Sequence, residues 1–213
     1  SGATLTPLPS WTACGIAGGA AKEYLEIIDT LLYNAAVIMS QDGRQEEILA
    51  ILDERKAAGD LTAGNYRTYR QLTGQRMIYN ASRAGDTVEA LGLLERLAEQ
   101  ELLSSATYTE YRAVLHGMRA GEISSNEGDF QALRYLESLD EAVRSDRRLQ
   151  SAIRIYTHNA AAEVHNSFVE LFRVENYARA GELLEEGLAD LPGNAMLLQD
   201  IELLKKVRNQ TVR

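Results

Sequence analysis

The fold is decided by residues 177–194, near the C-terminal end, which read YARAGELLEEGLADLPGN. Small and apolar residues recur there at three- and four-residue steps, from Ala180 through Leu184 to Gly187, and this spacing marks one face of a helix. The pattern stops at Pro192, because proline cannot continue a helix interior. The stretch therefore predicts an amphipathic helix that packs closely along its small residues.

Three earlier segments resemble one another, because each begins with a glycine turn that precedes a predicted helix. They are residues 43–48, 85–90 and 128–133, which begin 42 and 43 residues apart. A second match has the same spacing, because Leu61, Tyr66, Tyr69 and Arg70 recur as Leu103, Tyr108, Tyr111 and Arg112. Internal repeats of this length indicate stacked helical hairpins.

Apolar periodicity along the whole chain predicts an all-α protein. We expect an α-α superhelix, a solenoid of about four hairpins with a C-terminal capping helix, in which each pair covers the apolar edge of the pair before it. In the third hairpin, the second helix is expected to run from Phe130 through Leu139 to Val143. The expected organisation is an irregular lead-in (1–18) followed by a single domain (19–210), with hairpins at 19–59, 61–101, 103–146 and 149–191 and the cap helix at 194–208.

Composition limits the classes of partner. The net charge is −9, and an acidic surface repels phosphate backbones, so we expect no nucleic-acid binding. No apolar stretch approaches the roughly 18 residues that a membrane span needs. Cys14 is the only cysteine, which excludes an intrachain disulfide and fits either the cytoplasm or, if an export signal was removed, a bacterial periplasmic or lipid-anchored protein.

No motif in the sequence predicts catalysis or a cofactor. His158 and His165 lie seven residues apart on one predicted helix, which separates them by about 10 Å. That is too far for two ligands of one zinc ion, whose bonds to nitrogen are about 2 Å long. We find no nucleophile elbow, phosphate-binding glycine loop or metalloprotease helix. The sequence therefore predicts no metal, no cofactor and no enzymatic activity.

The region 161–194 resembles the tetratricopeptide repeat family. With a unit that starts at Ala161, the small and apolar residues Ala180, Leu184 and Gly187 and the final Pro192 fall on the positions that the family uses. Units 42 residues apart are longer than the family's repeat of about 34 residues, which predicts longer helices. The long hairpins and tyrosine-rich first helices also resemble pentatricopeptide repeats more weakly, but the acidic charge argues against the RNA binding of that family.

The resemblance implies a concave groove, lined by the first helix of each hairpin, that holds a peptide or protein. Arginine can grip a carboxylate with two parallel bonds, and asparagine can bond a ligand backbone in two directions. The alternative is that the asparagines satisfy neighbouring helix ends and the arginines are solvated. The partner-binding positions that the resemblance implies are Tyr33, Asn34, Arg76, Tyr79, Arg83, His165, Asn166 and Arg173.

The paired tyrosines of the second and third hairpins have two interpretations. Tyr66 and Tyr69, like Tyr108 and Tyr111, fit residues that pack between repeats and direct their hydroxyls to water or a turn. They also fit an aromatic shelf for a ligand.

These observations predict a non-enzymatic scaffold that binds a protein or peptide in its concave face. A self-associating or assembly subunit of a larger complex is the main alternative, so a homo-oligomer stays open. A carrier of a small molecule or lipid is a weaker one. The identity of the partner does not follow from the sequence.

Overall fold

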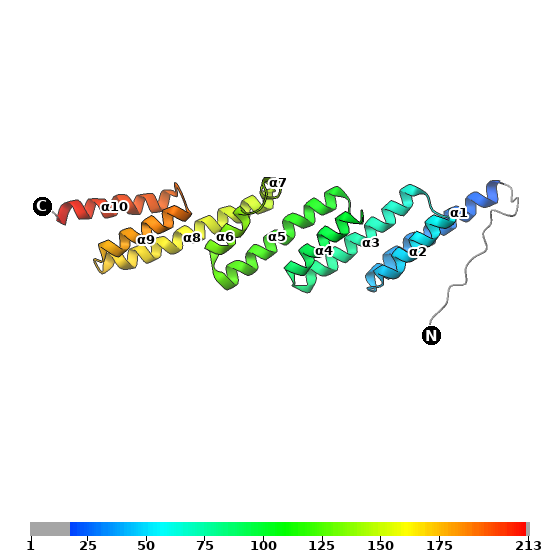
Figure 1. The fold of residues 1–213 in the computed structure, drawn as a ribbon, viewed down its shortest axis with the longest axis horizontal. Coiled ribbons are helices and arrows are strands. Elements are labelled where there is room, and N and C mark those ends of the chain that lie inside the picture. The colour runs from blue at the N-terminus through cyan, green and yellow to red at the C-terminus, as the bar shows by residue number, and fades with distance from the viewer. Residues whose placement is uncertain (1–17, 212–213) are drawn as a thin grey trace. The chain divides into compact units, whose positions relative to one another are not determined.

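The computed structural model of the protein describes residues 18–211, without the side chains of residues 18–21, 210 and 211. Cys14 and the predicted lead-in up to residue 17 lie outside the described residues. The described chain contains no strand, so the prediction of an all-α protein is confirmed. Its helices (Figure 1) are α1 (Gly18–Gln41), α2 (Gln45–Ala58), α3 (Ala63–Ala84), α4 (Thr87–Glu99), α5 (Ser105–Glu127), α6 (Asp129–Glu137), α7 (Glu141–Arg144), α8 (Arg147–Arg173), α9 (Tyr177–Asp190) and α10 (Ala195–Thr211).

The chain divides into two compact units, Ser1–Tyr111 and Arg112–Arg213. Helix α5 begins in the first unit and ends in the second. Each unit has buried apolar clusters of its own.

In the first unit, α1 and α2 form a hairpin, α3 packs against both of these helices, and α4 packs against α3. The buried residues of α1 recur at three- and four-residue steps, which places them on one face of the helix. They meet apolar side chains of α2 and α3, so one core joins the hairpin to the helix that follows it. This core consists of Ile28, Leu32, Ala36, Met39, Ile48, Leu52, Leu61 and Tyr69.

Local signals explain where the helices of this unit end and restart. Gly43 and Gly85 follow α1 and α3 with φ of 78° and 90°, a left-handed conformation that glycine adopts without strain. The carboxylate of Asp86 then accepts a hydrogen bond of 2.9 Å from the backbone N–H of Glu89. This bond caps α4, because the first N–H groups of a helix have no partner within it.

Residues 42 positions apart make the same hydrogen bonds in the first unit. The hydroxyl of Tyr66 donates to Asp53 at 2.6 Å, and the hydroxyl of Tyr108 donates to Glu95 at 2.9 Å. Each bond joins the first helix of one hairpin to the second helix of the hairpin before it. The first tyrosine of each pair therefore has a structural role that the repeat reproduces.

Gly74 allows an unusually close approach within this unit. A Cβ atom at this position would lie 2.1 Å from the carbonyl oxygen of Leu102. Only a residue without a side chain lets α3 lie this close to the segment that joins α4 to α5.

In the second unit, α8 packs against α6 and α9, and α10 packs against both α8 and α9. The largest side chain of its core is Phe168, which is 1% exposed. Gly187 brings α9 close to α8 and α10, because a Cβ there would lie 2.9 Å from Val164 and 3.3 Å from Leu197. The small residues of the stretch 177–194 thus serve close helix packing.

The expected helix from Phe130 to Val143 is wrong, because the structure divides it into two. Helix α6 ends at Glu137, and Leu139 lies outside any helix. Asp140 then adopts an extended backbone, and its carboxylate accepts a hydrogen bond of 3.0 Å from the N–H of Val143. This cap starts α7 as a new helix.

None of the helices among the described residues is both long and apolar enough to cross a membrane.

Candidate binding pocket

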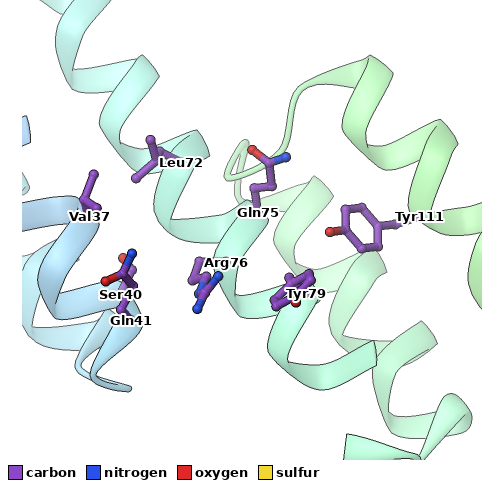
Figure 2. A pocket seen from close by; sticks show the side chains of 8 residues that line it. All are labelled: Val37, Ser40, Gln41, Leu72, Gln75, Arg76, Tyr79 and Tyr111. Atoms are coloured by element: carbon purple, nitrogen blue, oxygen red, sulfur yellow. The ribbon is translucent and has the colours of Figure 1, made fainter. Parts of the chain in front are cut away.

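A pocket of about 270 Å³ lies in the first unit, lined by α1, α3 and α5. Figure 2 shows Arg76 and Tyr79 of α3 between the residues of α1 and the ring of Tyr111 from α5. The full lining is Val37, Ser40, Gln41, Leu72, Gln75, Arg76, Tyr79 and Tyr111.

Helix α3 supplies the centre of the pocket because of the spacing of its polar residues. Gln75 and Tyr79 are four residues apart, as are Leu72 and Arg76, so each pair lies on adjacent turns of one face. Arg83 follows one turn after Tyr79. This face of α3 therefore gathers an amide, two guanidinium groups and a phenol.

Arg76 is held by aromatic contact and not by an ion pair. Its guanidinium carbon lies 4.9 Å from the centre of the Tyr79 ring, which is cation–π distance. Its Nε atom is buried and has no hydrogen-bond partner among the described residues. Leaving a buried donor of this kind unpaired costs about 1–3 kcal/mol.

Other half-buried arginines of the same unit have carboxylate partners. Arg55, with a side chain 16% exposed, lies 3.3 Å from Asp60, and Arg70, at 21%, lies 2.8 Å from Asp53. Arg76 is also half-buried, but no described carboxylate lies within ion-pair distance of it. The pocket thus contains a cation that the described residues leave without a counterion.

Tyr79 is polarised by a second arginine. Nη1 of Arg83 donates a hydrogen bond of 2.9 Å to the Tyr79 hydroxyl. This bond and the charge of Arg83 hold the pKa of Tyr79 below its ordinary value, and the charge of Arg76 adds to the effect. Because the hydroxyl oxygen accepts from Arg83, its own proton remains able to bond a ligand oxygen.

Tyr111 completes the pocket with a second hydroxyl. Burial raises the pKa of Tyr111, and the neighbouring Glu110 raises it further. The group therefore stays a neutral donor over the physiological range. Both tyrosines can give a hydrogen bond to an acceptor in the pocket.

The structure brings together three of the eight predicted partner-binding residues, Arg76, Tyr79 and Arg83. Tyr33 and Asn34 of α1 are both exposed and do not line this pocket. The ring of Tyr33 instead lies 5.8 Å from that of Tyr69, whose pKa burial raises to about 12.

The other three predicted residues lie in the second unit. Nδ1 of His165 lies 2.8 Å from the carboxylate of Asp200, whose side chain is 8% exposed, so this pair joins α8 to α10. Arg173 pairs with Glu170 at 3.0 Å on the exposed surface, and Asn166 is exposed. The second unit has a pocket of its own along α10, and none of these three predicted residues lines it. Its lining is Leu198, Gln199, Glu202, Leu203 and Lys206.

The resemblance to tetratricopeptide repeats also implied that Val37 and Gln75 face the groove. Sequence reasoning missed the other four lining residues as partner contacts, and one of these carried a signal. Tyr111 belongs to the repeated tyrosine pairs, which left a ligand shelf open as one interpretation. Ser40, Gln41 and Leu72 carried none, because their place in the lining depends on how α1 packs against α3.

Within residues 18–211, no group of histidine, cysteine and acidic side chains is placed to hold a metal ion. Comparisons with protein-family models, curated proteins and solved structures found no match. Fold and pocket together define an all-helical protein with an arginine- and tyrosine-lined pocket. Its function is inferred below from these residues.

Proposed function

We propose that the protein is a non-enzymatic scaffold that binds a peptide or another protein, with the Arg76 pocket as part of the contact surface. In this proposal the hairpins stack as a tetratricopeptide-like right-handed solenoid. The pocket lies on the face that the first helices form.

Helix packing within each unit supports the stacked arrangement. In the first unit α3 packs on both helices of the α1–α2 hairpin, and in the second α10 packs on both α8 and α9. A stack of repeats requires each hairpin to be covered by the helix that follows it, and these two helices make that contact.

The observation that carries the proposal is the lining of the pocket by α1, α3 and α5, the first helices of successive hairpins. Its volume of about 270 Å³ is below the 300–1,000 Å³ typical of cofactor and drug-sized sites. One or two side chains of a longer ligand fit this space better than a whole cofactor. A peptide that lies across the first helices and inserts one side chain into the pocket fits both the lining by three helices and the small volume.

A peptide-display selection against the full chain tests this proposal. We expect enriched peptides to bind the wild type and to lose most of their affinity for Tyr111→Ala and Arg76→Ala, as measured by calorimetry. Arg67→Ala is the matched control, because Arg67 is an exposed arginine of the same helix that does not line the pocket.

Two results would contradict the proposal. One is the absence of any enriched peptide, and the other is binding that both pocket variants leave unchanged. Circular dichroism establishes that each variant keeps its helix content before binding is compared.

Self-association is a second candidate that one observation favours. Ile27, Leu31 and Ile38 of α1 are 60%, 57% and 56% exposed. Their spacings of four and seven residues place them on one face of the helix. An exposed apolar stripe of this kind is typical of interaction surfaces.

Light scattering at micromolar concentration separates this candidate from the first. Self-association through the stripe predicts an oligomer that Ile27→Glu with Leu31→Glu converts to a monomer. A wild-type monomer under the same conditions contradicts it.

A further inference from the structure

We propose that the Arg76 pocket selects an acidic side chain, the carboxylate of a glutamate or aspartate in the bound peptide. This inference rests on the proposed function, since it requires that a peptide occupies the pocket. It adds the chemical class of the residue that the pocket recognises.

The first reason is the charge that Arg76 leaves uncompensated. Arg55 and Arg70 are half-buried, and each of them forms an ion pair with an aspartate. Arg76 meets the Tyr79 ring instead, and its Nε makes no hydrogen bond among the described residues. A ligand carboxylate supplies the missing counterion at the place where this chain provides none.

The second reason is the set of donors around the guanidinium. The Tyr79 hydroxyl accepts from Arg83 and directs its own proton elsewhere, and Tyr111 stands across the pocket with another hydroxyl. A carboxylate offers two oxygens with about four acceptor positions. One guanidinium and two phenols match this number of acceptors.

The apolar part of the lining fits the rest of the same side chain. Val37 of α1 and Leu72 of α3 face the pocket together with the amides of Gln41 and Gln75. The methylene groups of a glutamate can pack on the two aliphatic residues while its charged end reaches Arg76. A lysine in the same position would place its ammonium against a cation.

A carboxylate suits this site better than a phosphorylated side chain. A phosphoserine carries a charge of about −1.5 to −2, and such groups are recognised by clusters of arginines. Here Arg83 already donates to Tyr79, so Arg76 is the cation available to the ligand. One positive charge balances one carboxylate.

Capped peptide libraries test the inference directly on the full chain. Four libraries share random flanking residues and differ at a central position, which is glutamate, glutamine, lysine or phosphoserine. Acetylated and amidated ends leave the central and flanking side chains as the only charges. The retained fraction of each library is measured by affinity selection and mass spectrometry.

On the wild type we expect the glutamate library to be retained about tenfold more than the glutamine library, the preference that one charge-assisted hydrogen bond supports. Arg76→Gln should remove this preference, and Arg67→Ala should keep it. Arg76→Glu should reverse it in favour of lysine, which a variant that had merely unfolded would not do.

Each other outcome overturns a defined part of the proposal. Equal retention of glutamate and glutamine peptides, lowered for both by Tyr111→Ala, leaves peptide binding in place and rejects acidic selection. Stronger retention of phosphoserine than glutamate rejects the carboxylate as the ligand. Retention of no library on the wild type rejects acidic selection and peptide binding together.

Discussion

Gly74 and Arg76 stand two residues apart on α3 and act in different ways. Gly74 lets the helix touch the backbone at Leu102, which fixes where α3 lies. Arg76 then projects into the pocket with a charge that the described residues do not neutralise. The position of the helix and the chemistry of the pocket are thus set within a single turn.

Gly74→Ala should destabilise the protein by about 1–3 kcal/mol or more, because the added methyl group meets a backbone carbonyl and the chain must shift. Urea denaturation followed by circular dichroism measures the change. Gly64→Ala is the control on the same helix, since its Cβ would find only Thr62 Oγ1 at 3.9 Å. That substitution should be neutral or add up to about 1 kcal/mol, and equal losses in both variants would contradict the packing at Leu102.

The sequence predicted part of the pocket at the level of single residues. Arg76 and Tyr79 were among the partner-binding positions that the resemblance to tetratricopeptide repeats implied, and both line the pocket. Gln41 could not be predicted, because its place depends on the packing of two helices far apart in the sequence. The pairing of His165 with Asp200, 35 residues later, was missed for the same reason.

At the level of elements, α7 shows how a strong cap interrupts an apolar pattern. Leu136, Leu139 and Val143 recur with helical spacing, which favoured one helix, yet Asp140 starts a new one by bonding the N–H of Val143. The cap is a local signal and was available in the sequence. In a continuing helix, the N–H of Val143 would donate to a backbone carbonyl four residues earlier. The carboxylate of Asp140 accepts this bond instead, which favours the start of a new helix over continuation of the old one.

Acidity should weaken this cap. The hydrogen bond from Val143 holds the pKa of Asp140 below its ordinary value near 3.8, and the charge of Arg112 contributes. A depressed pKa stabilises the fold above the unfolded pKa and loses this contribution as pH falls through the folded value. The free-energy difference between wild type and Asp140→Asn should therefore shrink below about pH 4, as measured by urea denaturation across pH. A difference that is constant with pH would contradict the charged cap.

Close packing between elements makes a second prediction, at Ala180 of α9. This residue is 0% exposed in the core that contains Phe168, so Ala180→Leu should cost about 1–3 kcal/mol through overpacking. Ala178→Leu is the matched control, because Ala178 is exposed on the same helix. Thermal melting of the two variants compares them, and an unchanged midpoint for Ala180→Leu would contradict the close approach of α9.

At the scale of the whole molecule, the chain separates into two compact units although its repeats continue through both. The all-helical class followed from the sequence because periodicity and glycine turns occur throughout. The division did not follow, because it depends on the density of contacts between helices and not on any local residue pattern. The solenoid arrangement of the hairpins stays a prediction.

Hydrogen exchange should reveal whether the units unfold separately. In repeat proteins each element depends mainly on its neighbours, and local openings follow cooperative groups. Gly74→Ala should therefore reduce protection in α1–α4 and leave α8–α10 near wild-type values, as measured by exchange with mass spectrometry. Equal loss of protection in both regions would indicate that the chain unfolds as one cooperative body.

The bonds of Tyr66 to Asp53 and of Tyr108 to Glu95 give the first unit a modular character. In each pair the acid and the tyrosine lie 13 residues apart, and the second pair follows the first by 42 residues. Duplication or removal of a whole 42-residue segment would therefore leave each remaining tyrosine hydroxyl of these pairs opposite a carboxylate. Such a chain can be lengthened by copying whole 42-residue segments, because each copy brings its own tyrosine and its own acid.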